Sequence, residues 1–303
     1  MKARRSKESI AGVLFALPWL IGFTVFMLYP VCASIYYSFC EYSVLKPPIY
    51  VGFENYVDLF HDDIFRKSLW NTFFYVIISV PLSTIITIGL ALLLNAKIRG
   101  QAFYRTFFYL PSLVPQTALA CLWLWVFNSE HGLLNMGLEK LSGHFWIFHW
   151  HISGPPWLSD TTWSKPALIF MALWTGGNAM VIYLAGLQDV PVELLEASDL
   201  DGASPSAKLR HVTIPMISPV ILFNVIMAMI GAFQIFAVPY IMFPNGQPAQ
   251  STYFYVMYLF DTAIVYHKMG YACAMGWIMF ILIFVMTLLS LKVSEKRVYY
   301  SGG

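Results

Sequence analysis

Residues 191–215 read PVELLEASDLDGASPSAKLRHVTIP, and this polar stretch lies between two long apolar segments. The rest of the chain alternates apolar segments with connectors, so a long run of mixed charges and small residues at this place is an exception. A polar insert between two apolar segments is either a linker or an element that docks onto another protein. The surrounding chain supplies the context for choosing between them.

The composition of the chain is that of an integral membrane protein. Of its 303 residues, 58% are hydrophobic, 17% are aromatic and only 11% are charged. One soluble core cannot hide that much apolar material, so we expect an all-α integral membrane protein that forms one transmembrane domain over residues 1–303. The net charge of +2 is too small to indicate a nucleic acid partner.

Six apolar segments are predicted to cross the membrane, and each has enough residues to span about 30 Å of hydrocarbon. They are residues 10–39, 70–94, 107–127, 166–187, 217–243 and 270–291. The first follows the basic start MKARRSK but is longer than the apolar region of a signal peptide, so we interpret it as a transmembrane helix. Pro111 and Pro115 break the start of the third, after the basic loop NAKIRGQAFYRT. The connector 41–67 is expected to carry a short interfacial helix near Phe53–Phe60.

The distribution of lysine and arginine predicts the orientation. With the N-terminus in the cytoplasm, that side receives twelve of the eighteen Lys and Arg residues, and the other side six. The twelve are Lys2, Arg4, Arg5, Lys7, Lys97, Arg99, Arg105, Lys208, Arg210, Lys292, Lys296 and Arg297. The positive-inside rule therefore places both termini and the stretch 191–215 in the cytoplasm.

The polar stretch has the signature of two short helices joined by a sharp turn. Val192–Leu200 is compatible with a helix after Pro191, and Gly202 permits a reversal of the chain. Ser204 and Pro205 then form an N-cap and a first-turn proline for a second helix, which we expect to end at Pro215. Leu194, Leu195 and Ala197 give the first helix an apolar edge. Glu193, Glu196 and Asp199 give it an acidic one. This pattern fits a docking element in a partner's groove or a solvated amphipathic loop.

A family resemblance favours the docking element. Glu196-Ala197-Ser198-Asp199-Leu200-Asp201-Gly202-Ala203, followed by Ile214-Pro215, resembles the EAA loop of permease subunits of binding-protein-dependent ABC importers. The register matches that loop throughout: the acidic residue, the small residues, Asp-Gly-Ala and Ile-Pro all stand at the expected positions. Ser198 in place of the usual second alanine is the one departure. The resemblance implies the fold of type I ABC importer permeases.

The resemblance continues along nearly the whole chain and indicates the carbohydrate-uptake branch, with its maltose-, lactose- and glycerol-3-phosphate-type permeases. It is carried by VGFENYVDLF (51–60), NTFFYVIISVP (71–81), LNAKIRGQAFYRTFFYLP (94–111) and MGYACAMG (269–276). It implies a multi-pass protein of the bacterial inner membrane, a second permease subunit in a heterodimer, two ATPase subunits, and an extracytoplasmic solute-binding protein that delivers solute to the side of 128–165 and 244–268.

The same resemblance implies roles for residues in the loop. The stretch would form a coupling helix that seats in a cleft of the ATPase, with Glu196 as the carboxylate that pairs with it and Gly202 as the elbow. Ala197, Ser198, Asp201 and Ala203 complete this site. The chain carries no GxxxxGK[ST] phosphate loop. We therefore expect no catalysis and no cofactor in this chain, with ATP and Mg on the partner ATPase.

The six predicted spans contain no Asp, Glu, Lys, Arg or His. Ion-coupled transporters usually need ionisable groups at membrane depth, so the absence disfavours a secondary transporter and favours a neutral solute, a sugar or oligosaccharide. A glycerol-3-phosphate-type or other small solute remains the alternative. Polar and aromatic residues within the spans are candidates for the solute path: Asn178, Gln234, Thr175, Trp174, Asn224 and Tyr240. Each can equally bridge or pack between neighbouring helices.

Two further patterns have structural interpretations. His144, His149 and His151 lie in the aromatic run HFWIFHWH, without a carboxylate or cysteine at ligand spacing, so we favour interfacial packing and expect no metal. Gly176, Gly177 and Gly231 are expected to allow close approach of helices rather than to cradle a phosphate. No catalytic cluster that would indicate a membrane enzyme is found.

Overall fold

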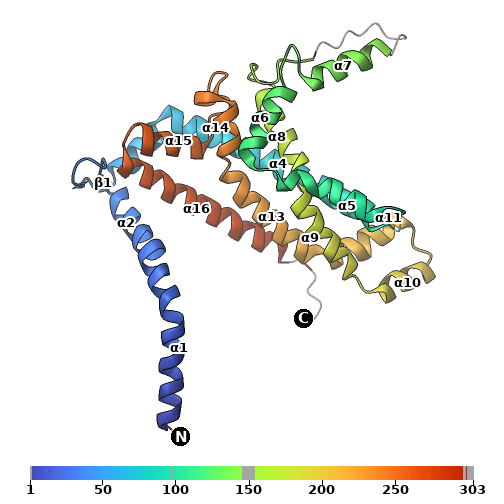
Figure 1. Cartoon of the computed structure of the whole chain (residues 1–303), viewed down its shortest axis with the longest axis horizontal. Coiled ribbons are helices and arrows are strands. Elements are labelled where there is room, and N and C mark those ends of the chain that lie inside the picture. Colours follow the sequence, from blue (N-terminus) through green and yellow to red (C-terminus); the bar gives the residue numbers. More distant parts are fainter. Residues whose placement is uncertain (1, 97, 145–153, 296–297, 299–303) are drawn as a thin grey trace. The chain divides into compact units, whose positions relative to one another are not determined.

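The computed structural model describes residues 2–96, 98–144, 154–295 and 298 (Figure 1). The side chains of residues 2–12 and 141–144 also lie outside this description. The predictions for His144, His149 and His151 fall on residues or side chains that are not described. The same holds for the charges of Lys2, Arg4, Arg5, Lys7, Lys97, Lys296 and Arg297. The described chain is largely helical and divides into two compact units.

The first unit comprises residues 1–62 and 259–281. Its first part is one continuous helix made of α1 (Lys2–Phe23), the π-helical turn η1 (Thr24–Leu28) and α2 (Tyr29–Ser38). A short antiparallel pair, β1 (Cys40–Glu41) and β2 (Ile49–Tyr50), follows and leads into α3 (Glu54–His61). Helix α3 confirms the short helix predicted in this connector. The unit ends with η5 (Asp261–Val265) and the first half of α16 (Met269–Ser294).

Hydrogen bonds tie the connector of this unit to the start of α16. The main-chain N–H of Gly270 donates to the carbonyl oxygen of Tyr42 at 3.1 Å, and the Tyr271 hydroxyl donates to Asp62 at 2.9 Å. A Cβ on Gly270 would lie 1.9 Å from the carbonyl oxygen of Cys40. Only glycine therefore fits where α16 begins against the connector.

The second unit comprises residues 63–258 and 282–303 and is built around α4 (Asp63–Asn95). Helix α4 packs against α8 (Ser164–Trp174), α9 (Gly177–Gln188) and α13 (Ser218–Phe233). The other helical segments of this unit are α5 (Gln101–Tyr109), η2 (Leu110–Leu113), α6 (Gln116–Val126), α7 (Leu133–His144), α10 (Val192–Leu200), α11 (Pro205–Lys208), η3 (Leu209–Thr213), α12 (Ile214–Met216), α14 (Ala237–Met242), η4 (Pro244–Gly246) and most of α15 (Tyr255–Phe260).

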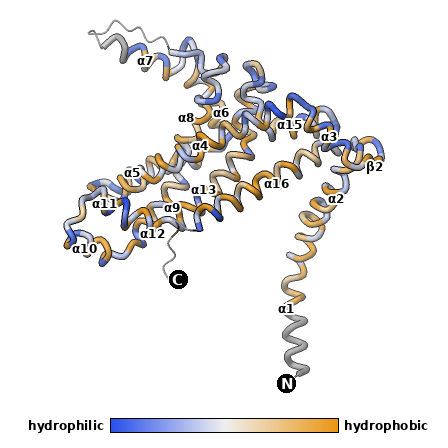
Figure 2. The backbone as a smooth tube through the Cα atoms, turned by 180° about the vertical axis from the view of Figure 1, so that it is seen from behind, coloured by the Kyte–Doolittle hydropathy of each residue, from blue (hydrophilic) through white to orange (hydrophobic). Residues whose placement is uncertain are grey.

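Four described helical stretches are long and apolar enough to cross a membrane: Val13–Ser38, Asp63–Asn95, Ser218–Met242 and Met269–Ser294. Apolar residues run along α4 and α16 in Figure 2. Two bent pairs pass the same test together, Gln101–Leu113 with Gln116–Val126 at 99° and Ser164–Trp174 with Gly177–Gln188 at 46°. Counting each pair as one span gives six, and helices dominate because lipid offers the backbone no hydrogen-bond partner.

The basic segment after α4 differs from its prediction as a loop. Helix α5 begins at Gln101, six residues before the predicted span at 107. Gly100, at φ +77°, allows the chain to turn, and the Gln101 side chain donates to the carbonyl oxygens of Leu94 and Ala96 at 2.7 and 3.2 Å. These bonds close the end of α4, so the next helix starts almost at once.

An apolar cluster holds α4, α9 and the start of α13 together. Its fully or nearly buried members are Ala91, Leu94, Met180, Tyr183, Leu184, Leu187, Val190 and Ile217. A Cβ on Gly186 of α9 would lie 3.1 Å from a Val220 methyl group on α13. Since lipid tails are as apolar as these side chains, close van der Waals packing rather than the hydrophobic effect stabilises this contact.

Candidate functional site

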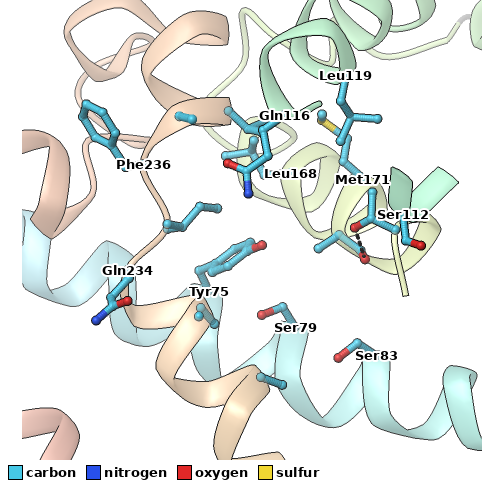
Figure 3. A pocket seen from close by; sticks show the side chains of 18 of the residues that line it. Tyr75, Ser79, Ser83, Ser112, Gln116, Leu119, Leu168, Met171, Gln234 and Phe236 are labelled. Atoms are coloured by element: carbon cyan, nitrogen blue, oxygen red, sulfur yellow. Dashed lines mark hydrogen bonds between the residues drawn. The ribbon is translucent and has the colours of Figure 1, made fainter. Parts of the chain in front are cut away.

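A cavity of about 530 Å³ lies in the second unit (Figure 3). Its walls come from α4, from the segment between α5 and α6, from the bend between α8 and α9, and from the segment between α13 and α14. The lining residues are Tyr75, Ser79, Val80, Ser83, Pro111, Ser112, Val114, Gln116, Leu119, Leu168, Met171, Ala172, Thr175, Asn178, Ala228, Gly231, Ala232, Gln234, Ile235, Phe236, Ala237 and Val238.

Three of the four walls are places where a membrane helix is interrupted. Pro111 and Pro115 interrupt the first, since proline lacks the N–H that a helix interior needs. The second breaks between Trp174 and Gly177, and the third between Phe233 and Ala237. Interrupted helices leave backbone N–H and C=O groups without their regular helical hydrogen bonds. At membrane depth, such irregular backbone is tolerated only where it is buried in protein or lines a cavity.

The continuous wall is a polar stripe on α4 that the sequence reasoning missed. Tyr75, Ser79 and Ser83 follow each other at intervals of four and all line the cavity, as Figure 3 shows. The signal was visible, because Asn71 and Thr87 extend the same spacing and residues at i and i+4 share one helix face. Tyr75 and Ser79 are only 5% and 4% exposed, so this part of the wall is almost fully buried.

Three of the six residues predicted for the solute path line this cavity: Thr175, Asn178 and Gln234. Thr175 and Asn178 come from the bend between α8 and α9, and Gln234 follows the end of α13. The Ser112 hydroxyl lies 3.5 Å from the Asn178 Oδ1 and donates to the carbonyl oxygen of Tyr109 at 2.6 Å. The side chains of Ser112 and Asn178 thus lie close to each other at two interrupted helices.

The other three predicted residues lie outside this cavity. Trp174 packs edge-on against Trp123, with ring centroids 5.6 Å apart, and lines a separate apolar pocket of about 370 Å³. The Asn224 Nδ2 donates to the carbonyl oxygen of Val220, four residues earlier on its own helix, at 2.9 Å. The Tyr240 ring lies 5.0 Å from that of Phe236. Trp174 and Tyr240 are thus positioned by packing against other aromatic rings. The Asn224 amide is positioned by a hydrogen bond within its own helix.

The break in the third span contributes residues that sequence reasoning did not single out. Ser112 lies between its two prolines, and Gln116 follows the second. Phe236, which follows Gln234 after α13, lies on the opposite side in Figure 3. Among the described residues that line the cavity, none is Asp, Glu, Lys, Arg or His. The cavity therefore presents hydroxyls, amides and flat aromatic rings without a formal charge.

The three glycines that were expected to allow close approach of helices have different surroundings: Gly231 lines the cavity, and Gly176 and Gly177 line the separate apolar pocket. A Cβ on Gly177 would lie 2.8 Å from the carbonyl oxygen of Phe108, and one on Gly176 would lie 2.5 Å from Thr87 Cγ2. Both confirm the predicted close approach of helices. The prediction for Gly231 is wrong, because among the described residues no atom lies within 4 Å of a Cβ built there, and Gly231 faces the cavity instead.

The polar stretch forms the predicted helix, elbow and second helix. Helix α10 covers Val192–Leu200, and Gly202 adopts φ +70°. The N–H of Gly202 donates to the carbonyl oxygen of Asp199 at 3.1 Å, and that of Ala203 to Ser198 at 3.0 Å. This pair of bonds is a Schellman motif, which satisfies the last carbonyls of α10 and reverses the chain.

Side chains fix both sides of the elbow. Ser204 caps α11 by accepting a hydrogen bond from the N–H of Ala207 at 3.3 Å. Lys208 pairs with Asp199 across the turn. The Ser198 hydroxyl is buried and donates to the carbonyl oxygen of Leu195 at 2.7 Å, so the departure from alanine at this position is accommodated inside α10.

The end of the second helix differs from its prediction. The chain stays helical through η3 and α12, and the interruption comes at Ile217 (φ −88°, ψ 4°) rather than at Pro215. Pro215 lies in the first turn of α12, where a missing N–H leaves no hydrogen bond unmade. The elbow is therefore connected to α13 through a nearly continuous helical segment.

The faces of α10 only partly match the predicted apolar and acidic edges. Leu195 packs against the apolar cluster of the second unit, and Ser198 lies on the same side. The exposed face carries Glu193, Glu196 and Ala197 together with Leu200, which is 90% exposed. A carboxylate and a large apolar side chain thus project side by side, with Asp201 and Gly202 exposed at the elbow.

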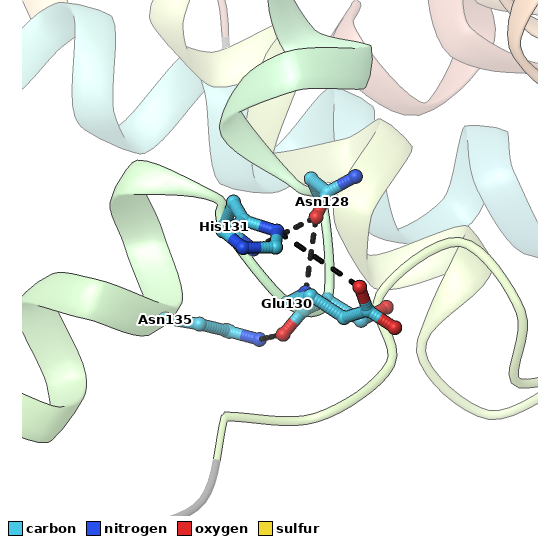
Figure 4. Close-up of polar contacts among 5 residues, drawn as sticks. Asn128, Glu130, His131 and Asn135 are labelled. Atoms are coloured by element: carbon cyan, nitrogen blue, oxygen red, sulfur yellow. Dashed lines mark hydrogen bonds and ion pairs between the residues drawn. The ribbon is translucent and has the colours of Figure 1, made fainter.

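A polar cluster organises the chain beyond α6 (Figure 4). The Asn128 Oδ1 accepts hydrogen bonds from the N–H groups of Glu130 and His131 at 3.0 and 2.9 Å. Asn135 is 3% exposed, donates to the carbonyl oxygen of Ser129 at 3.0 Å and accepts from the Trp157 indole at 2.7 Å. Among the described residues, no group of three His, Cys, Asp or Glu is arranged to hold a metal ion.

Comparison with known proteins gives one consistent result. The family described as "Binding-protein-dependent transport system inner membrane component" matches residues 83–299. A probable ABC transporter permease protein of Bacillus subtilis (YesP) is 36% identical over 307 residues, covering 100% of this chain and 96% of that protein. The sulfoquinovosyl glycerol transport system permease protein of Agrobacterium fabrum (SmoG) is 31% identical over 293 residues, covering 96% and 92%.

A solved structure shows the same fold. One chain of a bacterial alginate ABC transporter, crystallised in complex with an alginate pentasaccharide-bound periplasmic protein, superimposes with a TM-score of 0.82. The alignment covers 97% of this chain and 96% of that chain at 20% sequence identity. The predicted fold of an all-helical ABC importer permease is confirmed by this likeness.

Proposed function

Since the chain belongs to the family of binding-protein-dependent transport system inner membrane components, we propose that it forms half of the path for a neutral carbohydrate in an ATP-driven importer. The family makes it a multi-pass transport component of the inner membrane. The observation that carries the proposal is the cavity at three interrupted helices, because its lining offers uncharged hydrogen-bonding groups.

The chemistry of the cavity suits a sugar. Sugar hydroxyls both donate and accept hydrogen bonds, as do the amides of Gln116, Asn178 and Gln234. Tyr75 and Phe236 add ring faces, which pack against the apolar faces of pyranose rings. Carbohydrate as the substrate class is supported by relatives named for the transport of arabinooligosaccharides in Bacillus subtilis and of lactose in Rhizobium radiobacter.

The lining of the cavity favours an uncharged solute. An anion in a low-dielectric cavity needs a paired cation or a suitable dipole, since an isolated buried charge costs several kcal/mol. The described lining has no lysine, arginine or histidine that could pair with an anion, and the starts of α6 and α9 at the cavity offer only partial positive charges. The solute path is therefore assigned to a neutral sugar or oligosaccharide, with Asn178, Gln234 and Thr175 as contacts.

Coupling to the ATPase subunits is assigned to α10 and the turn at Gly202. Glu196, exposed on α10, would meet a cationic side chain of a cytoplasmic ATPase, and Leu200 beside it would fill an apolar part of the same cleft. The segment from α11 to α12 would transmit movement to α13, whose far end carries Gln234 at the cavity. ATP hydrolysis and Mg then belong to the partner.

The complete importer would contain a second permease subunit in a heterodimer, two ATPase subunits and an extracytoplasmic solute-binding protein. Both termini and the elbow are assigned to the cytoplasm by the positive-inside rule. The family description supports the binding-protein partner, and the alginate transporter provides an example of a related fold bound to one.

Uptake by the complete importer in proteoliposomes tests the proposal. We expect uptake of a neutral oligosaccharide delivered by the cognate binding protein, dependent on ATP, with a raised KM in Asn178→Ala and Gln234→Ala. The matched control is Asn224→Ala, since that amide bonds only to its own helix among the interactions described for it. Uptake that continues without ATP contradicts the importer. Uptake restricted to sugars with a carboxylate or sulfonate contradicts only the neutral solute.

A further inference from the structure

Helix α3 has three distinct faces. Asn55, Tyr56 and the fully buried Leu59 face the protein. An apolar strip, formed by Phe53 just before the helix with Val57 and Phe60, is 68%, 54% and 65% exposed. Glu54, Asp58 and His61 form an exposed polar strip. The exposed part of α3 is therefore itself amphipathic, with an apolar and a polar edge side by side.

Hydrogen bonds fix α3 at the end of α2. The Asn55 Nδ2 donates to the carbonyl oxygens of Ser38 and Cys40 at 2.9 and 3.0 Å, and the Tyr56 hydroxyl donates to the Ser38 Oγ at 2.9 Å. The Phe53 ring packs edge-on against Phe39 at 5.2 Å. Since α2 ends a 26-residue apolar stretch, α3 is held at the depth where that stretch leaves the hydrocarbon.

Aromatic side chains mark the same depth. The Tyr37 and Tyr42 rings stack 4.5 Å apart around the end of α2, and Tyr36 is 51% exposed. Tyrosine is enriched at the boundary between hydrocarbon and water, so the end of α2 carries the mark of the headgroup layer.

We propose that α3 lies in the headgroup layer of the leaflet at which α2 ends, with Phe53, Val57 and Phe60 inserted among acyl chains. A lipid surface fits better than a protein partner for two reasons. The apolar strip continues the exposed apolar surface of α2, where Val31 and Ile35 are 45% and 42% exposed. The adjacent polar strip needs water, and a helix lying in the interface meets both requirements at once.

The charges of α3 predict which lipid property matters. Its exposed polar strip carries two carboxylates, Glu54 and Asp58, and neither lysine nor arginine. Attraction to anionic headgroups therefore contributes nothing, and burial of apolar surface supplies the binding. Insertion is expected to be the same in phosphatidylcholine and in mixtures with phosphatidylglycerol.

Spin labels at neighbouring positions test the proposal in the complete importer in phosphatidylcholine nanodiscs. Labels at Val57→Cys and, as the matched control, Asp58→Cys are placed in a chain whose four native cysteines are replaced. We expect the ratio of oxygen to nickel-chelate collision rates to be severalfold higher at 57 than at 58. Equal ratios, or a label at 57 that neither reagent reaches, would overturn the proposal in favour of water or a protein cover.

A second measurement leaves the native cysteines in place. A benzophenone amino acid at Val57 or Asp58 is photoactivated in the same nanodiscs, and the crosslinked adducts are identified and quantified by mass spectrometry. Lipid adducts at 57, several times more abundant than at 58 and unchanged by phosphatidylglycerol, support insertion. Adducts at 57 to another subunit, or a yield that rises severalfold with phosphatidylglycerol, contradict it.

Discussion

The main-chain N–H of Ala203 donates to the carbonyl oxygen of Ser198 at 3.0 Å, spanning Gly202 at φ +70°. Among the described residues, nothing lies within 4 Å of a Cβ built on Gly202. The requirement for glycine is therefore set by the backbone alone, since a left-handed conformation costs other residues about 1–2 kcal/mol.

Gly202→Ala is accordingly expected to disturb the elbow without a steric clash. Uptake by the complete importer should fall, while assembly with the ATPase is retained or weakened, because α10 no longer ends in the same geometry. Gly137→Ala in α7 is the matched control, as its Cβ also meets nothing within 4 Å and its φ is not positive. Equal uptake by the two variants would contradict the role of Gly202.

The ion pair between Asp199 and Lys208 is expected to stiffen the same elbow. Their side chains are 64% and 24% exposed, so the pair contributes less than about 1 kcal/mol and weakens in salt. Asp199→Lys and Lys208→Asp should each lower the efficiency of uptake per ATP hydrolysed, and the double exchange should restore it. A double variant that is no better than the worse single variant would show that the pair does not act through its charges.

The helix–elbow–helix could be predicted from the sequence because its signals are local. Gly202, Ser204 and Pro205 each impose a backbone conformation or a cap at their own position, and the structure has the turn where they stand. The interruption at Ile217 was missed because Pro215 also suits a first helical turn. A proline alone does not say on which side of it a helix breaks.

The cavity was predictable only in part. Thr175, Asn178 and Gln234 stand out as polar residues in apolar spans, whereas Trp174 and Tyr240 turn elsewhere because helix rotation depends on packing against distant segments. The stripe of Tyr75, Ser79 and Ser83 has a visible four-residue spacing. Serine on a membrane helix often bonds to its own backbone, as Ser83 does to Val80 at 3.0 Å, and this hides its second role.

Gly177→Ala is expected to displace the wall of the cavity. The new Cβ would lie 2.8 Å from the carbonyl oxygen of Phe108 and 3.0 Å from the Cα of Tyr109, and backbone cannot yield as a side chain does. Overpacking of this kind costs about 1–3 kcal/mol. Thermal unfolding in detergent should show the loss, with Gly89→Ala in α4 unaffected, since no atom lies within 4 Å of its Cβ among the described residues.

Asn71→Ala is expected to destabilise the loop between α14 and α15. Asn71 is 2% exposed, and its Nδ2 donates to the carbonyl oxygens of Gln250 and Tyr253 at 2.9 and 3.0 Å. Removing the amide leaves the carbonyl oxygens of Gln250 and Tyr253 without this donor, at a cost of about 1–3 kcal/mol.

The loop itself raises the expected effect of losing Asn71. Asn245, Ala249 and Gln250 have φ values of 53°, 48° and 57°. Residues other than glycine adopt this left-handed backbone conformation at a cost of about 1–3 kcal/mol each, so the surrounding structure must impose it. Asn224→Ala is the matched control, because that buried amide holds only a carbonyl of its own helix among its described bonds. Hydrogen exchange of the loop should rise in Asn71→Ala and not in Asn224→Ala. Equal protection of the loop in both variants would mean that the helix ends, rather than Asn71, hold it in place.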